Sequence, residues 1–264
     1  MLDLINVRKT FNAKTVNEKI ALAGVNLHLE DGDIVTVIGG NGAGKSTTLN
    51  AIAGVWPVDE GQIILDGKEL THLPEHRRAG MLGRVFQDPM TGTAATMQIE
   101  ENLALASRRG KFRGLGAGIT KQERLEYKEL LKILDLGLEE RLTAKVGLLS
   151  GGQRQALTLL MATMQKPKLL LLDEHTAALD PKTAAKVLET TRLVVEKDNL
   201  TTLMITHNMR DAIAYGNRLI MMYNGRVVVD VSGEEKKKLT VEQLMELFSK
   251  ASGSDEANDK LLLS

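Results

Sequence analysis

The residues best suited to chemistry lie in one glycine-rich segment, Gly39-Gly40-Asn41-Gly42-Ala43-Gly44-Lys45-Ser46. This segment matches the pattern G-x-x-x-x-G-K-[ST], in which the glycines let backbone N–H groups surround a phosphate. A helix that begins here adds partial positive charge. We expect Lys45 to reach the β- and γ-phosphates of ATP and the Ser46 hydroxyl to bind Mg²⁺. Thr47 and Thr48 are further candidates for phosphate contacts.

Two adjacent carboxylates, Asp173 and Glu174, follow directly after the apolar run Leu169–Leu172. In open α/β folds, ligands bind where parallel strands end. Asp173 is suited to the Mg²⁺ shell, and Glu174 to polarising an attacking water as a general base. Taken alone, such a pair is more often a solvated strand end. Together with the phosphate-binding pattern, the pair predicts hydrolysis of ATP.

These groups need a sheet and helices to hold them in place. Ile34–Ile38 reads as a buried strand that runs into the glycine-rich segment, and a helix is expected over Lys45–Ala53. This strand-and-helix context disfavours a chance match to a glycine-rich turn. Further apolar runs read as strands and amphipathic runs as helices: Leu82–Phe86, Leu169–Leu172, Thr201–Ile205 and Leu219–Tyr223 as strands, Pro181–Lys197 and Met209–Tyr215 as helices. Strands that alternate with helices predict an α/β fold with a mostly parallel sheet covered on both faces.

The middle of the chain has a different character, because helical patterns dominate from about residue 89 to about 164. We expect an inserted helical subdomain there, between core segments 1–88 and 165–231. Its last helix places apolar residues at helical spacing that should face a core: Ala156, Leu157, Leu160, Met161 and Met164. In the segment 232–264 we expect one amphipathic helix at Val241–Phe248, docked on the core, and a mobile tail from Ser252.

Composition excludes several classes of protein. Lys plus Arg and Asp plus Glu number 34 each, so the net charge gives no reason to expect a nucleic-acid partner. There is no cysteine for disulfides or thiolate chemistry. Charged residues lie too close to the N-terminus for a signal peptide. No apolar run approaches the roughly 20 residues that a membrane-spanning helix needs. If the protein serves a membrane process, other subunits must supply the membrane part.

A third motif, Leu149-Ser150-Gly151-Gly152-Gln153, lies between the other two. In this order the three motifs resemble the ATP-binding-cassette (ABC) ATPases, over about residues 2–231. The resemblance implies a RecA-like P-loop NTPase core, an N-terminal antiparallel β region and an inserted helical subdomain. It also implies a head-to-tail dimer with two ATPs. The partner subunit would complete each site with residues of the signature loop and the D-loop: Ser150, Gly151, Gly152, Gln153 and Asp180.

The resemblance assigns three further residues. Gln87 is similar to the Q-loop glutamine that contacts the metal or water, and His207 to the switch histidine at the γ-phosphate. Phe11 is similar to the aromatic residue that stacks on adenine, where most members have tyrosine. Simple core packing is the alternative for Phe11. One departure is His175, where many members have proline after the glutamate, and a structural or surface role is expected for it.

Only the resemblance to known cassettes indicates which process ATP hydrolysis drives. Thr96–Leu105 resembles the stretch after the Q-loop in bacterial importers, and Arg77–Gln87 resembles cassettes of amino-acid uptake systems. This implies a peripheral ATPase at the cytoplasmic face of the membrane, with no nucleic-acid partner. The implied partners are a second ATPase subunit, membrane permease subunits and an extracytoplasmic substrate-binding protein. A homodimer is expected, although the sequence leaves a heterodimer open.

Two alternatives remain at this point. A soluble ABC ATPase of DNA repair or translation would usually carry a long coiled-coil insert or a second cassette, and this chain has neither. A basic loop could still contact nucleic acid through Arg108, Arg109, Lys111 and Arg113. A non-hydrolysing regulatory subunit is disfavoured because Lys45, Asp173, Glu174 and His207 are all present.

Overall fold

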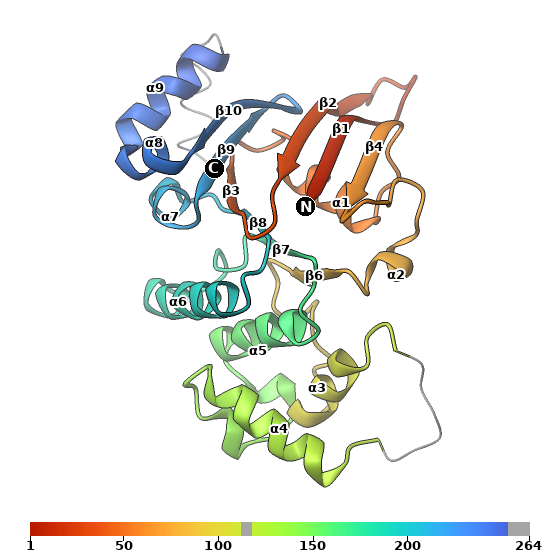
Figure 1. Ribbon diagram of the computed structural model, residues 1–264, viewed down its shortest axis with the longest axis vertical. Coiled ribbons are helices and arrows are strands. Elements are labelled where there is room, and N and C mark those ends of the chain that lie inside the picture. Colours follow the sequence, from red (N-terminus) through yellow and green to blue (C-terminus); the bar gives the residue numbers. More distant parts are fainter. Residues whose placement is uncertain (112–117, 253–264) are drawn as a thin grey trace. The chain divides into compact units, whose positions relative to one another are not determined.

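Apolar runs predicted as strands pair with one another in the computed structural model, which describes residues 1–111 and 118–252 (Figure 1). The chain divides into two compact units. The first comprises Met1–Arg78 together with the segment from Leu200 onward, and the second comprises Ala79–Asn199.

The first unit contains an antiparallel sheet with strand order β2-β1-β4-β5. Its strands are β1 (Leu2–Phe11), β2 (Lys19–Leu29), β4 (Glu60–Leu65) and β5 (Lys68–Glu69). In β1, Leu2, Leu4 and Val7 are buried. This sheet confirms the antiparallel N-terminal region that the family resemblance implied.

The same unit holds four strands of a second sheet, in the order β10-β9-β3-β8. They are β3 (Ile34–Ile38), β8 (Thr202–Ile205), β9 (Arg218–Tyr223) and β10 (Arg226–Ser232). Strand β3 pairs in parallel with both β8 and β9, whereas β10 is antiparallel to β9. The helices of this unit are α1 (Lys45–Ala53), α2 (Glu75–Arg78), α7 (Met209–Ala214), α8 (Gly233–Lys238) and α9 (Val241–Ser252).

Two elements near the C-terminus were not predicted. Strand β10 follows a tight Asn224-Gly225 turn in which both residues have positive φ. Asn-Gly between apolar runs is a strong hairpin signal, so the sequence did carry this information. Helix α8 was read as a charged stretch, but its acids lie in the first turn and its lysines in the last, which suits the helix dipole.

The helix predicted at Val241–Phe248 is present within α9 and docks on the core, as expected. Leu244 and Phe248 are buried with residues of α7, β9 and β10 in one cluster. The Phe248 ring meets Tyr223 edge to face, with centroids 5.5 Å apart. The tail predicted to be mobile lies, beyond Ser252, outside the described residues.

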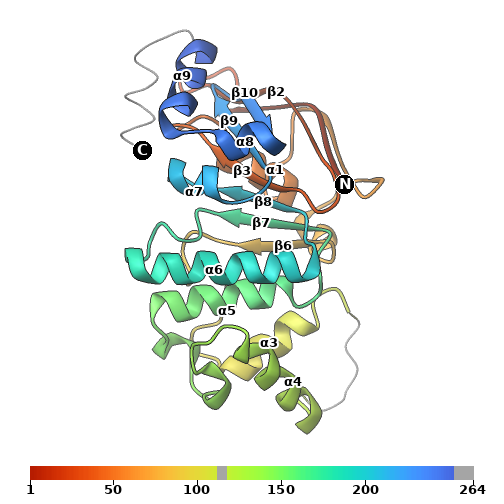
Figure 2. The ribbon, with the colours of Figure 1, turned by 60° about the vertical axis from the view of Figure 1, so that its left-hand side comes forward.

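The second unit pairs β6 (Leu82–Val85) in parallel with β7 (Leu169–Asp173). Its helices are α3 (Ile99–Ser107), α4 (Lys121–Lys132), α5 (Gly151–Thr163) and α6 (Pro181–Asp198), with short 3-10 turns η1 (Leu138–Glu140) and η2 (Val146–Leu148). Figure 2 shows α5 and α6 lying alongside each other. With the parallel pairs of the first unit, this confirms the predicted α/β class and mostly parallel sheet.

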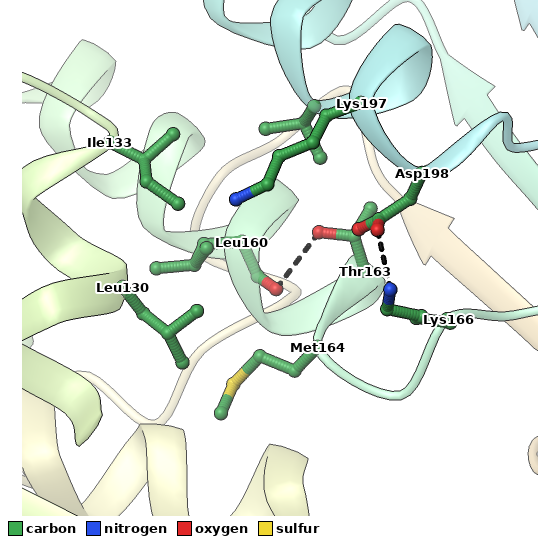
Figure 3. A pocket seen from close by; sticks show the side chains of 9 residues that line it. Leu130, Ile133, Leu160, Thr163, Met164, Lys166, Lys197 and Asp198 are labelled. Atoms are coloured by element: carbon green, nitrogen blue, oxygen red, sulfur yellow. Dashed lines mark hydrogen bonds and ion pairs between the residues drawn. The ribbon is translucent and has the colours of Figure 1, made fainter.

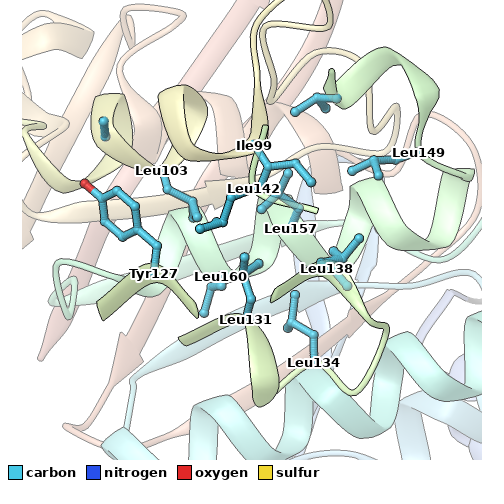
Figure 4. Packing of buried hydrophobic residues seen from close by; sticks show 13 residues of the cluster. Ile99, Leu103, Tyr127, Leu131, Leu134, Leu138, Leu142, Leu149, Leu157 and Leu160 are labelled. Carbon is cyan, nitrogen blue, oxygen red and sulfur yellow. The ribbon is translucent and has the colours of Figure 1, made fainter. Parts of the chain in front are cut away.

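Helices α3, α4 and α5 enclose a hydrophobic cluster within the second unit (Figure 4). Ala156, Leu157 and Leu160 of α5 belong to it, and Met161 and Met164 pack against its edge. The periodicity of α5 therefore predicted its core face correctly. Because α5 begins at the signature loop, this cluster also fixes the position of that loop within the unit.

Candidate active site

The glycine-rich segment connects β3 to α1 in the first unit, as predicted. Gly39, Gly42 and Gly44 all have positive φ, which glycine adopts without steric cost. A β-carbon on Gly39 would lie 2.3 Å from the carbonyl oxygen of Met222, and one on Gly44 would lie 2.7 Å from that of Ala21. Only glycine fits at these two positions. The residues present therefore form the narrow backbone cradle that phosphate binding requires.

Lys45 lies in the first turn of α1 and is buried. Its Nζ donates to the carbonyl oxygens of Gly39, at 2.5 Å, and Gly40, at 3.3 Å. The ammonium group thus lies over the loop that would receive the phosphates. Ser46 is exposed on the same turn, whereas the buried Thr48 donates its hydroxyl hydrogen to Gly44 O at 2.9 Å. Thr48 therefore ties α1 to the loop.

Two other predicted residues lie in the same unit. His207 follows the end of β8, and since β8 is parallel to β3, their carboxyl ends lie at one edge of the sheet. Phe11 ends β1 and is half-buried. Its ring meets Trp56 edge to face at 4.9 Å between centroids, so packing accounts for part of its surroundings.

The second unit brings Gln87, Asp173 and Glu174 to the ends of two paired strands. Val85 of β6 pairs with Leu172 of β7, so Gln87 and Glu174 each come two residues later, at the same edge. Glu174 has φ +47, a left-handed conformation that non-glycine residues adopt mainly at turns or constrained sites. Gln87 is exposed.

Arg84 is a site neighbour that sequence reading missed. One of its terminal nitrogens lies 3.8 Å from a carboxylate oxygen of Asp173, and its guanidinium lies 4.4 Å from the Phe86 ring centroid. Arg84 pairs with Leu171, and side chains alternate along a strand, so Arg84 and Asp173 share a face. A charged residue inside an otherwise apolar strand was the available signal.

The signature loop caps α5 through its own side chains. The Ser150 hydroxyl accepts from the Gln153 backbone N–H at 3.2 Å, and the Gln153 side chain accepts from the Ser150 N–H at 3.1 Å. This reciprocal capping box explains why serine and glutamine stand three residues apart. Ser150 and Gly151 stay exposed, so the helix N-terminus is open to solvent on this unit.

Asp180 of the predicted D-loop caps α6, where its side chain accepts from the Thr183 N–H at 3.1 Å. Hydrogen bonds from Thr183 hold the pKa of the Asp180 carboxyl below its usual range. His175, in contrast, is buried, and its Nε2 lies 3.0 Å from Thr191 Oγ1. Burial lowers the pKa of His175 to about 4. Its environment is that of a structural residue, as expected.

The predicted basic loop is largely bound to its own helices. Arg108 forms an ion pair with Glu123 at 2.6 Å, and Arg109 donates to the carbonyl oxygen of Ala162. Lys111 is exposed, and Arg113 lies outside the described residues. The two described arginines are therefore occupied within this unit, which gives no support to a nucleic-acid contact.

A cavity of about 170 Å³ lies between α4, α5 and the end of α6 (Figure 3). Leu130, Ile133 and Leu160 form its apolar wall, and Lys166 pairs with Asp198 at its rim at 2.6 Å. None of its lining residues is a predicted site residue. This cavity is therefore not the candidate active site.

Comparison with known proteins decides the family. A family model described as ABC transporter matches residues 22–177. The chain belongs to the ABC transporter ATPase family. A tyrosine transport ATP-binding protein of Clostridioides difficile (strain R20291) is 46% identical over 252 residues, which is 95% of this chain and 100% of that protein. This ABC ATPase therefore binds and hydrolyses ATP as the ATP-binding subunit of a transporter.

Two further comparisons agree with this assignment. The methionine import ATP-binding protein MetN of Rhizobium etli (strain CFN 42) is 36% identical over 229 residues, which is 85% of this ABC ATPase and 59% of MetN. The solved dimer of the ATP-binding cassette MJ0796, bound to ADP and Pi, has a TM-score of 0.75 and 31% identity. That match covers 88% of this chain and 98% of MJ0796. No helix in the described part of the chain is long and apolar enough to cross a membrane.

Proposed function

We propose that this ABC ATPase powers the import of an amino acid through separate membrane subunits. One observation carries the proposal, namely the 46% identity to a tyrosine transport ATP-binding protein along the whole of that protein. The likeness to a methionine import ATP-binding protein supports both import and an amino-acid cargo. The segments Thr96–Leu105 and Arg77–Gln87 agree with this, by their resemblance to importer and amino-acid uptake cassettes.

The phosphates of ATP would lie on the 39–46 loop. The positive φ angles there, and the close backbone approaches at Gly39 and Gly44, support this position because side chains at those two glycines would clash. Lys45 would turn from the Gly39 and Gly40 carbonyl oxygens toward the β- and γ-phosphates. Phe11 would offer the exposed part of its ring to adenine, and Thr47 a hydroxyl to a phosphate oxygen.

The hydrolytic step would use residues at the ends of strands. Glu174 would accept a proton from the attacking water, and His207 would hold the γ-phosphate. Ser46, Gln87 and Asp173 carry the oxygen donors that Mg²⁺ prefers. When bound, Mg²⁺ would neutralise charge on the phosphates. Arg84 lies 3.8 Å from Asp173, so this carboxylate already has one cationic neighbour in the same unit.

The signature loop would act on the nucleotide of a second subunit. The open N-terminus of α5 at Ser150 can bind an anion, with Gly151, Gly152 and Gln153 in its first turn. Asp180 at the start of α6 would also face the partner. The solved MJ0796 dimer supports a two-fold assembly of this kind. We propose residues 89–164 as the helical subdomain that receives the membrane subunits, with the ATPase at the cytoplasmic face.

The site assignment is tested by single-turnover and steady-state ATPase assays. We expect Glu174→Gln to retain ATP binding and to lose about 10²–10⁴-fold in hydrolysis, because the general base is removed. Lys45→Ala should weaken binding or turnover. Exposed Lys68→Ala, on β5, is the matched control and should behave as wild type. Wild-type hydrolysis by Glu174→Gln would remove Glu174 from this role.

The transport assignment is tested by co-purification from native membranes and identification of the associated chains. We expect permease subunits, a substrate-binding protein and ATPase activity stimulated when vesicles carry the complete complex and an external aromatic amino acid. Spermidine and a sugar serve as control cargos. A complex that moves no amino acid, or moves it outward, contradicts the proposal, as would recovery with ribosomes or DNA instead of membrane proteins.

A further inference from the structure

Lys19 lies at the start of β2, directly across the antiparallel pair from Phe11, the last residue of β1. Phe11, the proposed adenine contact, is the last residue of β1 in the first unit. Since paired residues in a sheet lie about 5 Å apart, Lys19 starts from a position next to the proposed base site.

The side chain of Lys19 extends toward the glycine-rich loop. A β-carbon placed on Gly42 would lie 3.4 Å from Lys19 Nζ and 4.0 Å from its Cε. Gly42 is exposed in the middle of the 39–46 loop. The ammonium group of Lys19 therefore reaches the backbone that would hold the phosphates, from a different strand than the one that leads to Lys45.

The charge of Lys19 is available for a ligand. In residues 1–111 and 118–252, Lys19 Nζ makes no hydrogen bond and no ion pair, and the side chain is exposed. Nearby lysines differ, because Lys9 pairs with Asp59 at 2.9 Å and Lys45 donates to Gly39 and Gly40. A polyphosphate on the loop would bring anionic oxygens to this ammonium group without first breaking a salt bridge.

We propose that Lys19 is a second cationic contact for the phosphate chain of the nucleotide, placed between the adenine contact and the 39–46 loop. The inference rests on the proposed position of the phosphates on that loop. Its role is in binding, because Lys19 adds positive charge that recognises the phosphate chain rather than the base. The charge of Lys19 should therefore matter for the affinity of nucleotides that carry a phosphate chain and not for the affinity of adenosine.

The test compares ATP, ADP and adenosine binding by calorimetry in EDTA, so that binding is measured without a metal ion. Lys19→Met keeps the apolar stem and removes the charge. We expect it to weaken ATP and ADP about tenfold, the size of a partly solvated charge-assisted contact, and to leave adenosine unchanged. Lys19→Arg should retain most of the affinity, and Lys68→Met is the control. The loss of ATP and ADP affinity caused by Lys19→Met should be smaller at high salt, because screening weakens the attraction between exposed charges.

Two results would overturn the inference, each separable from failure of the proposed site. If Lys45→Ala weakens ATP binding while Lys19→Met binds ATP as wild type, the loop is the phosphate site and Lys19 is no part of it. Equal weakening of adenosine and ATP by Lys19→Met would also overturn it, because no charge-dependent contact would remain. If Lys45→Ala has wild-type ATP affinity and turnover and Lys19→Met also binds ATP as wild type, the proposed site itself fails.

Discussion

The imidazole of His175 is 2% exposed and lies next to Thr191, one residue after the proposed general base. Burial disfavours its charged form and lowers its pKa from 6.5 to about 4. His175 thus fills, as a neutral packed side chain, a position where many ABC ATPases have proline. Its hydrogen bond ties the end of β7 to α6 and helps to hold the backbone that carries Glu174.

This burial predicts an acid-sensitive stability. Below pH 6.5 the unfolded chain takes up a proton at His175, whereas the folded protein does not until about pH 4. The free energy of unfolding should therefore fall as the pH is lowered through this window, by up to roughly 1 kcal/mol per pH unit. Urea unfolding of wild type and His175→Gln across the window measures it. The glutamine variant cannot titrate, so parallel pH profiles for the two proteins would contradict the assignment.

At the scale of elements, Gly152 sets the distance between α5 and α6. A β-carbon on Gly152 would lie 2.0 Å from Thr183 Cγ2, so the Thr183 side chain or the two helices would have to shift. Without such a clash, replacing a glycine in a helix by alanine would stabilise the helix slightly, because alanine has the higher helix propensity. The signature glycine therefore has a packing role as well as its proposed role toward the partner's nucleotide.

We predict that Gly152→Ala destabilises the protein by about 1–3 kcal/mol, the usual cost of an overpacked contact. Adding Thr183→Ser removes the clashing methyl group, keeps the hydroxyl at Asp180, and should restore most of the stability. Gly151→Ala is the matched control, since its β-carbon would meet only the flexible end of Leu179 at 3.3 Å. Denaturant unfolding measures all three. If Thr183→Ser brings no recovery, the contact between α5 and α6 is not the cause.

At the scale of the whole molecule, ATP is expected to control assembly. The N-terminus of α5 is open on the isolated chain, and the solved MJ0796 cassette is dimeric. A γ-phosphate shared by two subunits would hold the dimer together, and departure of the cleaved phosphate would release it. ATP should therefore shift the population of assemblies, and ADP should not.

The prediction is that Glu174→Gln forms a stable dimer with ATP and stays monomeric with ADP. Wild type should form the dimer only briefly, because hydrolysis removes the bridging phosphate. Light scattering coupled to size exclusion gives the mass in each state. Lys45→Ala, which disturbs the nucleotide site, serves as the control and should remain monomeric. A Glu174→Gln protein that stays monomeric at saturating ATP would contradict this account.

The sequence by itself determined the features that depend on neighbouring residues. The glycine pattern of 39–46 predicted a loop because each glycine can adopt positive φ whatever its distant neighbours are. Ser150 and Gln153 predicted the start of a helix because a capping box needs only residues within one turn. The bounds of β3 and α1 followed from apolar runs and breakers. Family membership followed from the order of three such local motifs along the chain.

Only the tertiary structure decided contacts between residues far apart in the chain. The register of β6 and β7 placed Arg84 beside Asp173, and the packing of α6 buried His175 against Thr191. The pairing of β1 with β2 brought Lys19 to Gly42, although Lys19 alone reads as an ordinary surface lysine. Local patterns fix backbone conformation, whereas strand register and helix packing depend on the whole chain. Sequence reasoning thus predicted the glycine-rich loop, and the fold was needed to show which charged side chains lie near it.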